Sequence, residues 1–160
     1  MKEEFIARTV QAVVEDVLTK RTSMTLKLAT ALVKRVEQKA ENMGLAVVVA
    51  VSDASARPVA IHCMDGAYIA SFDVALNKTF TSAGLKISTA ELGKLSQPGE
   101  SLYGVQFTNE GKIVIFGGGE PLMIGDTMIG ALGVSGGTAE QDTKLAAYGK
   151  SILKEVIACL

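Results

Sequence analysis

Apolar residues recur at helical spacing in the first two segments of the chain. Residues 5–18 carry Ile, Val and Leu on one side and Glu, Arg and Gln on the other, which predicts a short amphipathic helix. A polar run at residues 19–23 predicts a linker. Residues 25–43 repeat the amphipathic pattern and end at Gly44, a natural helix C-cap, so we predict a second helix there.

The next apolar runs are shorter and rich in β-branched residues. Residues 45–51 are almost entirely Val and Ala, and residues 59–64 form a second run after a turn at 52–58. Such a pair predicts a β-hairpin. Residues 67–83 return to helical spacing, and residues 88–95 predict another short helix that stops before Pro98.

Glycine changes the pattern in the second half of the chain. Ten of the 16 glycines lie between Gly104 and Gly137. They separate four apolar runs, at residues 102–107, 112–116, 121–124 and 128–134, which predict a meander of antiparallel strands with tight turns at 110–111 and 125–126. Thr138 and Gln141 then fit a capping box, so a helix should run to about residue 159. The order of elements predicts an α+β fold with a mainly antiparallel sheet.

Composition narrows the classes of function. The 16 Lys and Arg residues are balanced by 17 Asp and Glu residues, so no basic excess exists for general nucleic-acid binding. No stretch approaches the ~18 uncharged apolar residues of a membrane span, and the first ten residues lack the apolar core of a secretory signal. Two cysteines, Cys63 and Cys159, fit a reducing cytosol, so a cytoplasmic protein is expected.

Two glycine motifs are candidates for chemistry. The run at 117–119 matches neither nucleotide-binding signature; it is either a bend between strands or a backbone that approaches a ligand closely. Residues 133–137 match G-x-S-x-G around Ser135, but a hydrolase of that type needs a histidine after the serine, and the only histidine is His62. Gly136 and Gly137, just before a helix, suit either an anion site or a hinge capped by Thr138.

Three titratable side chains are further candidates for ligand binding or catalysis. His62 is either a hydrogen-bonded structural residue or a ligand for haem iron or a corrin cobalt. Lys78 either holds a propionate or phosphate or lies on a solvated helix face. Asp65 can orient a neighbour or cap a helix, and with Lys78 it is the best acid–base pair that the sequence offers an enzyme.

Four segments together carry a family resemblance. They are MDGA at 64–67, SFDVALNKT at 71–79, GGGEPL at 117–122 and IGALGVSGGTAEQD at 129–142. In this order they resemble the GlcG/HbpS family of haem-binding or haem-degrading-type domains, which includes the C-terminal domain of PduO. The resemblance covers about residues 24–158, and SLYGVQ at 101–106 is similar to small members that accompany diol dehydratase systems.

The resemblance implies a profilin-like fold with a central antiparallel sheet flanked by helices. It also implies homo-oligomers, often octamers, and a ligand that is haem or a related tetrapyrrole or corrinoid. The cofactor-binding positions that it implies are Asp65, Lys78, Gly117, Gly118, Gly119, Pro121, Gly136, Gly137 and Glu140. Family members often have arginine where this chain has Cys63, so His62 becomes the candidate metal ligand by elimination and not by motif.

The expected function is therefore a small oligomeric accessory domain, spanning residues 24–160, that binds a tetrapyrrole and serves a diol-using bacterial microcompartment. Residues 4–18 resemble the encapsulation peptides of microcompartment cargo, which dock on shell or enzyme partners. An ordinary helix packed on the domain is the alternative for this segment. The alternatives for the domain are an enzyme, for oxidative haem degradation or for a small hydroxy acid or aldehyde, and a chaperone-like assembly protein.

Overall fold

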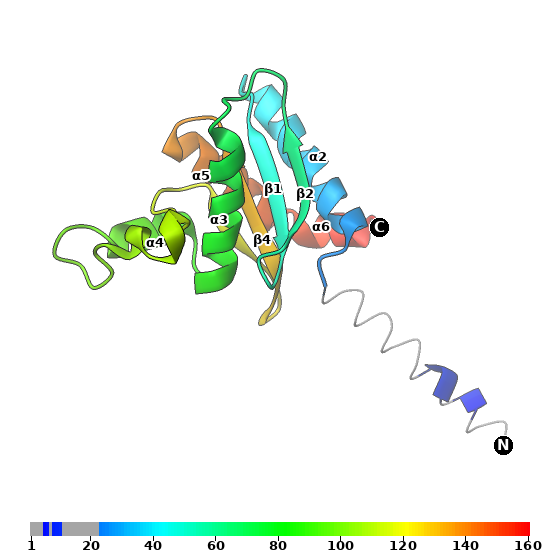
Figure 1. The fold of residues 1–160 in the computed structure, drawn as a ribbon. Helices are drawn as coiled ribbons and strands as arrows, with labels where there is room; N and C mark the ends of the chain where they lie inside the picture. Colours follow the sequence, from blue (N-terminus) through cyan, green and yellow to red (C-terminus); the bar gives the residue numbers. More distant parts are fainter. Residues whose placement is uncertain (1–4, 7, 11–22) are drawn as a thin grey trace.

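The computed structural model describes residues 5, 6, 8–10 and 23–160 (Figure 1). The helix expected at 5–18 and the linker at 19–23 lie largely outside the described residues; residues 5, 6 and 8–10 are helical. The first labelled helix is α2, Leu26–Asn42, which confirms the prediction for 25–43. Thr25 begins it by accepting a hydrogen bond on its side chain from the amide of Leu28.

Four strands form one antiparallel sheet in the order β2-β1-β4-β3. Their bounds are β1 Val48–Asp53, β2 Pro58–Cys63, β3 Gly119–Ile124 and β4 Thr127–Ser135. β1 and β2 form the expected hairpin, and β3 and β4 form another across Gly125 and Asp126, where a tight turn was predicted. The predicted α+β fold with a central antiparallel sheet flanked by helices is confirmed.

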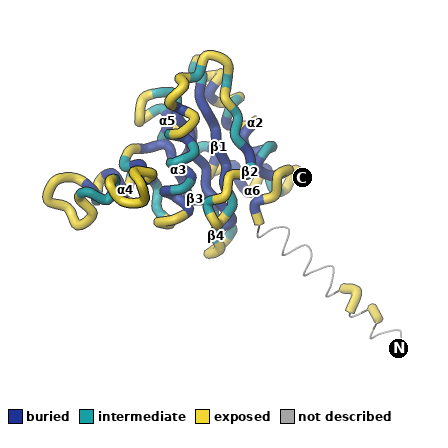
Figure 2. The backbone as a smooth tube through the Cα atoms, viewed as in Figure 1, coloured by how far each residue is buried: buried dark blue, intermediate teal, exposed yellow. Residues whose placement is uncertain are grey.

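Helices cover both faces of the sheet, and β1 alternates between them (Figures 1 and 2). Val49 and Val51 point into the main core, which they share with α2, α5 (Ala139–Ser151) and α6 (Leu153–Ala158). Val48 and Ala50 point the other way and pack against α3, Ser71–Leu85. β1 carries apolar side chains on both faces and is buried at the centre of the molecule.

A line of small residues lets α3 approach the sheet closely. Ala50, Gly133 and Gly119 are register partners across β1, β4 and β3. A Cβ added to Gly133 would overlap the carbonyl oxygen of Ala75 in α3. The absence of a side chain at this position is thus a packing requirement between helix and sheet.

The predicted strands at 102–107 and 112–116 are wrong. After α4, Thr89–Leu95, the chain forms two short 3-10 helices, η1 (Val105–Phe107) and η2 (Asn109–Gly111). Gly104 has a positive φ angle inside the first of these predicted strands, and Asn109 and Glu110 have positive φ angles in the connection between the two, beside the tight turn predicted at 110–111. Residues 113–115 form no strand. The segment 96–112, here called the arm, projects from the body of the molecule beside α4 (Figure 1).

Two helix boundaries also differ from the prediction. α3 begins at Ser71 and not at 67, because the residues after β2 form turns. The last helix breaks at Ile152 into α5 and α6. No helix in the described part of the chain has the length and apolar character that crossing a membrane requires.

Candidate functional site

Two charged side chains meet in the interior, where α3 faces the beginning of α5. Nζ of Lys78 donates hydrogen bonds to Oδ2 of Asp142 at 2.9 Å and to the carbonyl oxygen of Val134 at 2.7 Å. The side chain of Lys78 is fully buried, and that of Asp142 is 4% exposed. Lys78 therefore does not lie on a solvated helix face.

The ammonium group of Lys78 is enclosed on several sides. Burial lowers its pKa below the usual 10.5, because a desolvated cation is disfavoured, while the charge and hydrogen bond of Asp142 oppose this effect. The ring centroid of Phe116 lies 5.0 Å from Nζ, within cation–π range. The ammonium of Lys78 thus contacts a carboxylate, a carbonyl oxygen and an aromatic ring inside the protein. Its charge is not exposed at the surface.

Asp142 also fixes the entrance to α5. Its Oδ1 accepts a hydrogen bond from the amide of Gly137 at 2.9 Å, so one carboxylate joins α3 to the turn before α5. The predicted capping box is confirmed: Thr138 and Gln141 exchange side-chain and backbone hydrogen bonds of 2.8 and 3.2 Å. Of the glycine pair before this helix, Gly137 therefore donates its amide to Asp142 within the protein and not to a bound anion.

The glycines at 117–119 face protein side chains. A Cβ on Gly118, whose φ is 115°, would lie 2.6 Å from Nζ of Lys78. A Cβ on Gly117 would overlap the hydroxyl of Thr143. The amide of Gly119 donates to Oγ1 of Thr89 at 2.9 Å. The close approach that these glycines permit is made to α3, α4 and α5.

The remaining predicted positions are dispersed. Ser135 is buried and donates to Oγ of Ser71 at 3.2 Å. Pro121 is buried within β3, whereas Asp65 after β2 and Glu140 in the first turn of α5 are exposed. The structure therefore gathers Lys78 with the glycines at 117–119 and 136–137, and leaves Asp65 outside this group.

His62 lies on the other face of the sheet from Lys78. It is the register partner of Val49, which points into the core beside α2, and its Nδ1 lies 2.9 Å from Oε1 of Glu37 in α2. Its side chain is 36% exposed. The sequence-predicted residues thus do not line a single pocket, because the sheet separates His62 from Lys78.

The Glu37–His62 contact determines what the imidazole can do. When Nδ1–H donates to the Glu37 carboxylate, Nε2 carries the free lone pair, which is the arrangement found for most metal-ligating histidines. Cys63, next in the chain, points to the opposite face as the partner of Val48. Within the described residues, no cluster of three or more His, Cys, Asp or Glu side chains forms a metal site.

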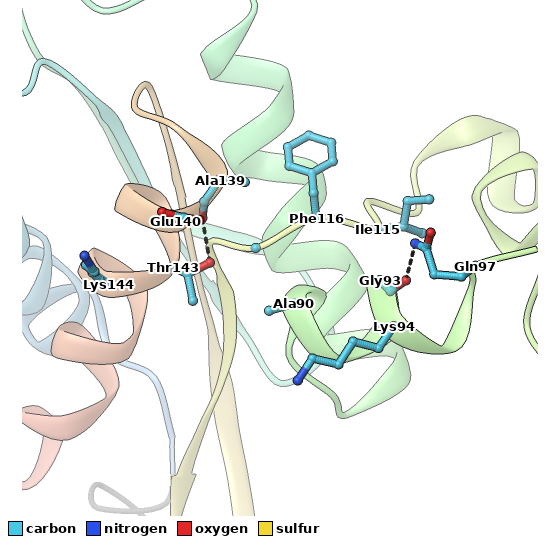
Figure 3. A pocket seen from close by; sticks show the side chains of 11 residues that line it. Ala90, Gly93, Lys94, Gln97, Ile115, Phe116, Ala139, Glu140, Thr143 and Lys144 are labelled. Carbon is cyan, nitrogen blue, oxygen red and sulfur yellow. Dashed lines mark hydrogen bonds between the residues drawn. The ribbon is translucent and has the colours of Figure 1, made fainter. Parts of the chain in front are cut away.

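A cleft of about 520 Å³ opens between α4 and α5 (Figure 3). Its apolar floor includes Ala90, Ile115 and Phe116, and its charged rim residues include Lys94 and Lys144. The volume falls in the range of small-molecule sites, ~300–1,000 Å³. Gly117 and Glu140, both predicted to bind a cofactor, line this cleft, whereas His62 does not.

Sequence reasoning missed the partners of the predicted residues. The partner of His62 is Glu37, and the partners of Lys78 are Phe116 and Asp142. These partners lie far along the chain from His62 and Lys78, so no local sequence pattern identifies the contacts. For Asp142 one signal existed, since it ends the motif at 129–142. The position of this carboxylate in the motif was a reason to look for a buried cation beside it.

Comparison with known proteins identifies the family. The family model described as "Haem degrading protein HbpS-like" matches residues 24–150, most of the chain. The chain belongs to the HbpS-like family. This confirms the resemblance inferred from the four motifs.

The chain is similar to three individual proteins. An uncharacterized 15.0 kDa protein from the dhaT–dhaS intergenic region of Citrobacter freundii is 44% identical over 78% of this chain and 87% of its own. Corrinoid adenosyltransferase PduO of Salmonella typhimurium is 36% identical over 72% of this chain, but over only 34% of its own length. The crystal structure of a PduOC–heme complex superposes with a TM-score of 0.77 at 32% identity, covering 81% of this chain and 94% of the other.

Proposed function

We propose that this HbpS-like chain binds haem and that Nε2 of His62 is its protein ligand for the iron. The observation that carries this proposal is the 2.9 Å contact between Nδ1 of His62 and Glu37. A carboxylate at Nδ1 fixes the tautomer and raises the basicity of Nε2. The ring is also partly exposed, so a planar cofactor can reach it from outside without unfolding the sheet.

The comparisons support the nature of the cofactor. PduOC, 32% identical, is known as a complex with heme, and the family model carries the description of a haem degrading protein. A corrinoid is the related alternative, because PduO is named as a corrinoid adenosyltransferase and an imidazole nitrogen also binds cobalt. The match to a third of PduO gives no reason to assign its transferase activity to this chain.

Catalysis has weaker support than binding. Asp65 is exposed, and the ammonium of Lys78 is held by Asp142 and Val134, so the two do not form an acid–base pair. Oxidative haem degradation remains the second candidate on the strength of the family description. Loss of the haem absorbance band on adding ascorbate under air, with release of iron, would favour it.

Self-association is part of the same proposal. The arm carries three exposed large apolar side chains, on Leu102, Tyr103 and Phe107, and the last is 81% exposed. Side chains of this size on a projecting segment are typical of surfaces that another protein covers. We assign them to contacts between copies in a homo-oligomer.

Residues 4–18 are the proposed route to a microcompartment. Within the described part of this segment, Phe5, Ile6 and Val10 are all exposed. An apolar helix face without a covering partner suits docking into a groove of a shell or enzyme protein. The domain would then work inside the compartment lumen.

The deciding experiment is a haemin titration followed by absorbance, on protein without a polyhistidine tag. The proposal expects a saturable Soret shift at one haem per chain. Hydroxocobalamin in place of haemin tests the corrinoid alternative. Absence of any shift with either probe would refute tetrapyrrole binding.

A further inference from the structure

The cleft between α4 and α5 has no part in the proposed attachment of haem to His62. We propose that it is a separate binding site for a planar aromatic anion, whose ring stacks on Phe116 and whose carboxylate or sulfonate pairs with Lys94. The ligand class follows from three features of the cleft: a polarised aromatic floor, fixed walls and an unpaired cation.

The floor is unusual because a buried cation lies beneath it. Phe116 is 48% exposed, and its ring lies 5.0 Å from the buried ammonium of Lys78. The ammonium attracts the π electrons of the ring toward the interior, which makes the outer face less negative. A second, electron-rich ring then stacks on that outer face with less repulsion than on an ordinary phenylalanine.

The walls are held in place by glycine contacts. A Cβ on Gly93 of α4 would overlap the carbonyl oxygen of Ile115, and a Cβ on Gly117 would overlap Thr143 of α5. Both helices therefore pack directly on the backbone of 115–117, and the cleft exists before any ligand arrives. Little conformational freedom is lost on binding, which favours affinity for a rigid, planar molecule.

The charges around the cleft are not paired with one another. Within the described part of the chain, Lys94, Lys144 and Glu140 have no ion-pair partner. Figure 3 shows the Lys94 side chain extended from α4 past Ala90, with its ammonium directed away from the Phe116 ring, as is the ammonium of Lys144 on α5. An anion is thus favoured beside Lys94, with Glu140 as the opposing charge.

This site lies apart from His62. The cleft adjoins the segment that enters β3, whereas His62 lies on β2, at the opposite edge of the sheet. One planar ligand in one chain therefore does not engage both. Binding in the cleft and binding of haem by His62 are separable events in the same protein.

The test uses 8-anilinonaphthalene-1-sulfonate, an anionic aromatic probe whose fluorescence rises in apolar sites, with the full-length protein. We expect one probe per chain, bound about ten-fold more weakly by Phe116→Ala and about two- to five-fold more weakly by Lys94→Gln. Tyr68→Ala and Lys154→Gln, which remove an exposed ring and an exposed lysine elsewhere, should leave the affinity unchanged. Glu140→Gln should strengthen binding, since it removes the opposing charge.

Three results would overturn the proposal. The first is Phe116→Ala binding the probe as tightly as Tyr68→Ala does, with both variants folded by circular dichroism. The second is equal binding of the neutral analogue N-phenyl-1-naphthylamine, which would exclude a role for Lys94. The third is displacement of the probe by haemin in His62→Ala, which would make the cleft the tetrapyrrole site. Failure of the wild-type protein to bind haemin, with probe binding intact, would refute the His62 assignment and leave the cleft standing.

Discussion

Nζ of Lys78 and Oδ2 of Asp142, 64 positions apart in the chain, meet at 2.9 Å in the interior, where the Lys78 side chain is fully buried and that of Asp142 is 4% exposed. The pair joins α3 to the start of α5, and Asp142 extends it to the amide of Gly137. A buried ion pair is costly to desolvate and gains little net stability, but it is strongly destabilising when only one partner is removed. The segment Gly136–Asp142 is therefore held by electrostatics as well as by its capping box.

The first prediction concerns this pair. Lys78→Met alone and Asp142→Leu alone should each lower the free energy of unfolding by about 3–5 kcal/mol, because each leaves a buried charge uncompensated. The double variant should lose much less than the sum, since both charges are gone. Urea unfolding of the four proteins measures the coupling. Additive losses would mean that the two groups do not interact.

The second prediction is a pH dependence. Burial lowers the pKa of Lys78 below 10.5 in the folded chain, so the unfolded chain binds more protons between that lowered pKa and 10.5. The free energy of unfolding should therefore rise with pH through this window, by at most about 1.4 kcal/mol per pH unit. The double variant lacking Lys78 and Asp142 serves as reference, and the difference from wild type should grow with pH. A constant difference would contradict the lowered pKa.

The third prediction tests self-association through the arm. Tyr103→Ser with Phe107→Ser should convert the oligomer to the 16.8 kDa monomer in sedimentation velocity, because the change removes most of the exposed apolar surface of the arm. Leu26→Ser, which replaces an exposed apolar side chain on α2, is the matched control and should leave the oligomer intact. A wild-type protein that sediments as a monomer at micromolar concentration would refute the proposal.

The fourth prediction concerns residues 4–18. Deleting residues 1–20 should abolish co-localisation with a microcompartment shell while the remaining domain keeps its circular dichroism spectrum. The same segment fused to a fluorescent protein should carry it into the compartment. Entry of the truncated domain into the compartment would show that the signal lies elsewhere.

The sequence predicted regular elements well wherever side-chain pattern alone decides them. β1 is rich in valine, β2 is a short apolar run after a turn, α2 has a clean amphipathic stripe, and Thr138 begins α5 with a capping box. The arm was missed because its apolar runs resemble strands. What determines its fold is backbone conformation, with positive φ at Gly104, Asn109 and Glu110. Glycine and asparagine commonly adopt positive φ, whereas glutamate does not, so only Glu110 gave no signal.

The candidate site was predictable in its members but not in its pairings. Lys78 and the glycines at 117–119 were identified, and the structure brings them together. Whether Lys78 faces a ligand, solvent or a carboxylate depends on how α3 packs against α5, which no local pattern encodes. The partner of His62, Glu37, likewise comes from a distant element, α2. The register between β1 and β2 decides which face of the sheet His62 occupies, and the sequence does not determine this register.

The central claim is that His62 supplies the iron ligand, and the fifth prediction tests it by electron paramagnetic resonance of the ferric haem complex of untagged protein. The chain has a single histidine, so a signal of histidine-ligated ferric haem can arise only from His62. Wild type should give that signal, Glu37→Gln should give it with a weakened ligand field, and His62→Ala should lose it and regain it with added imidazole. An unchanged spectrum in His62→Ala would contradict the account.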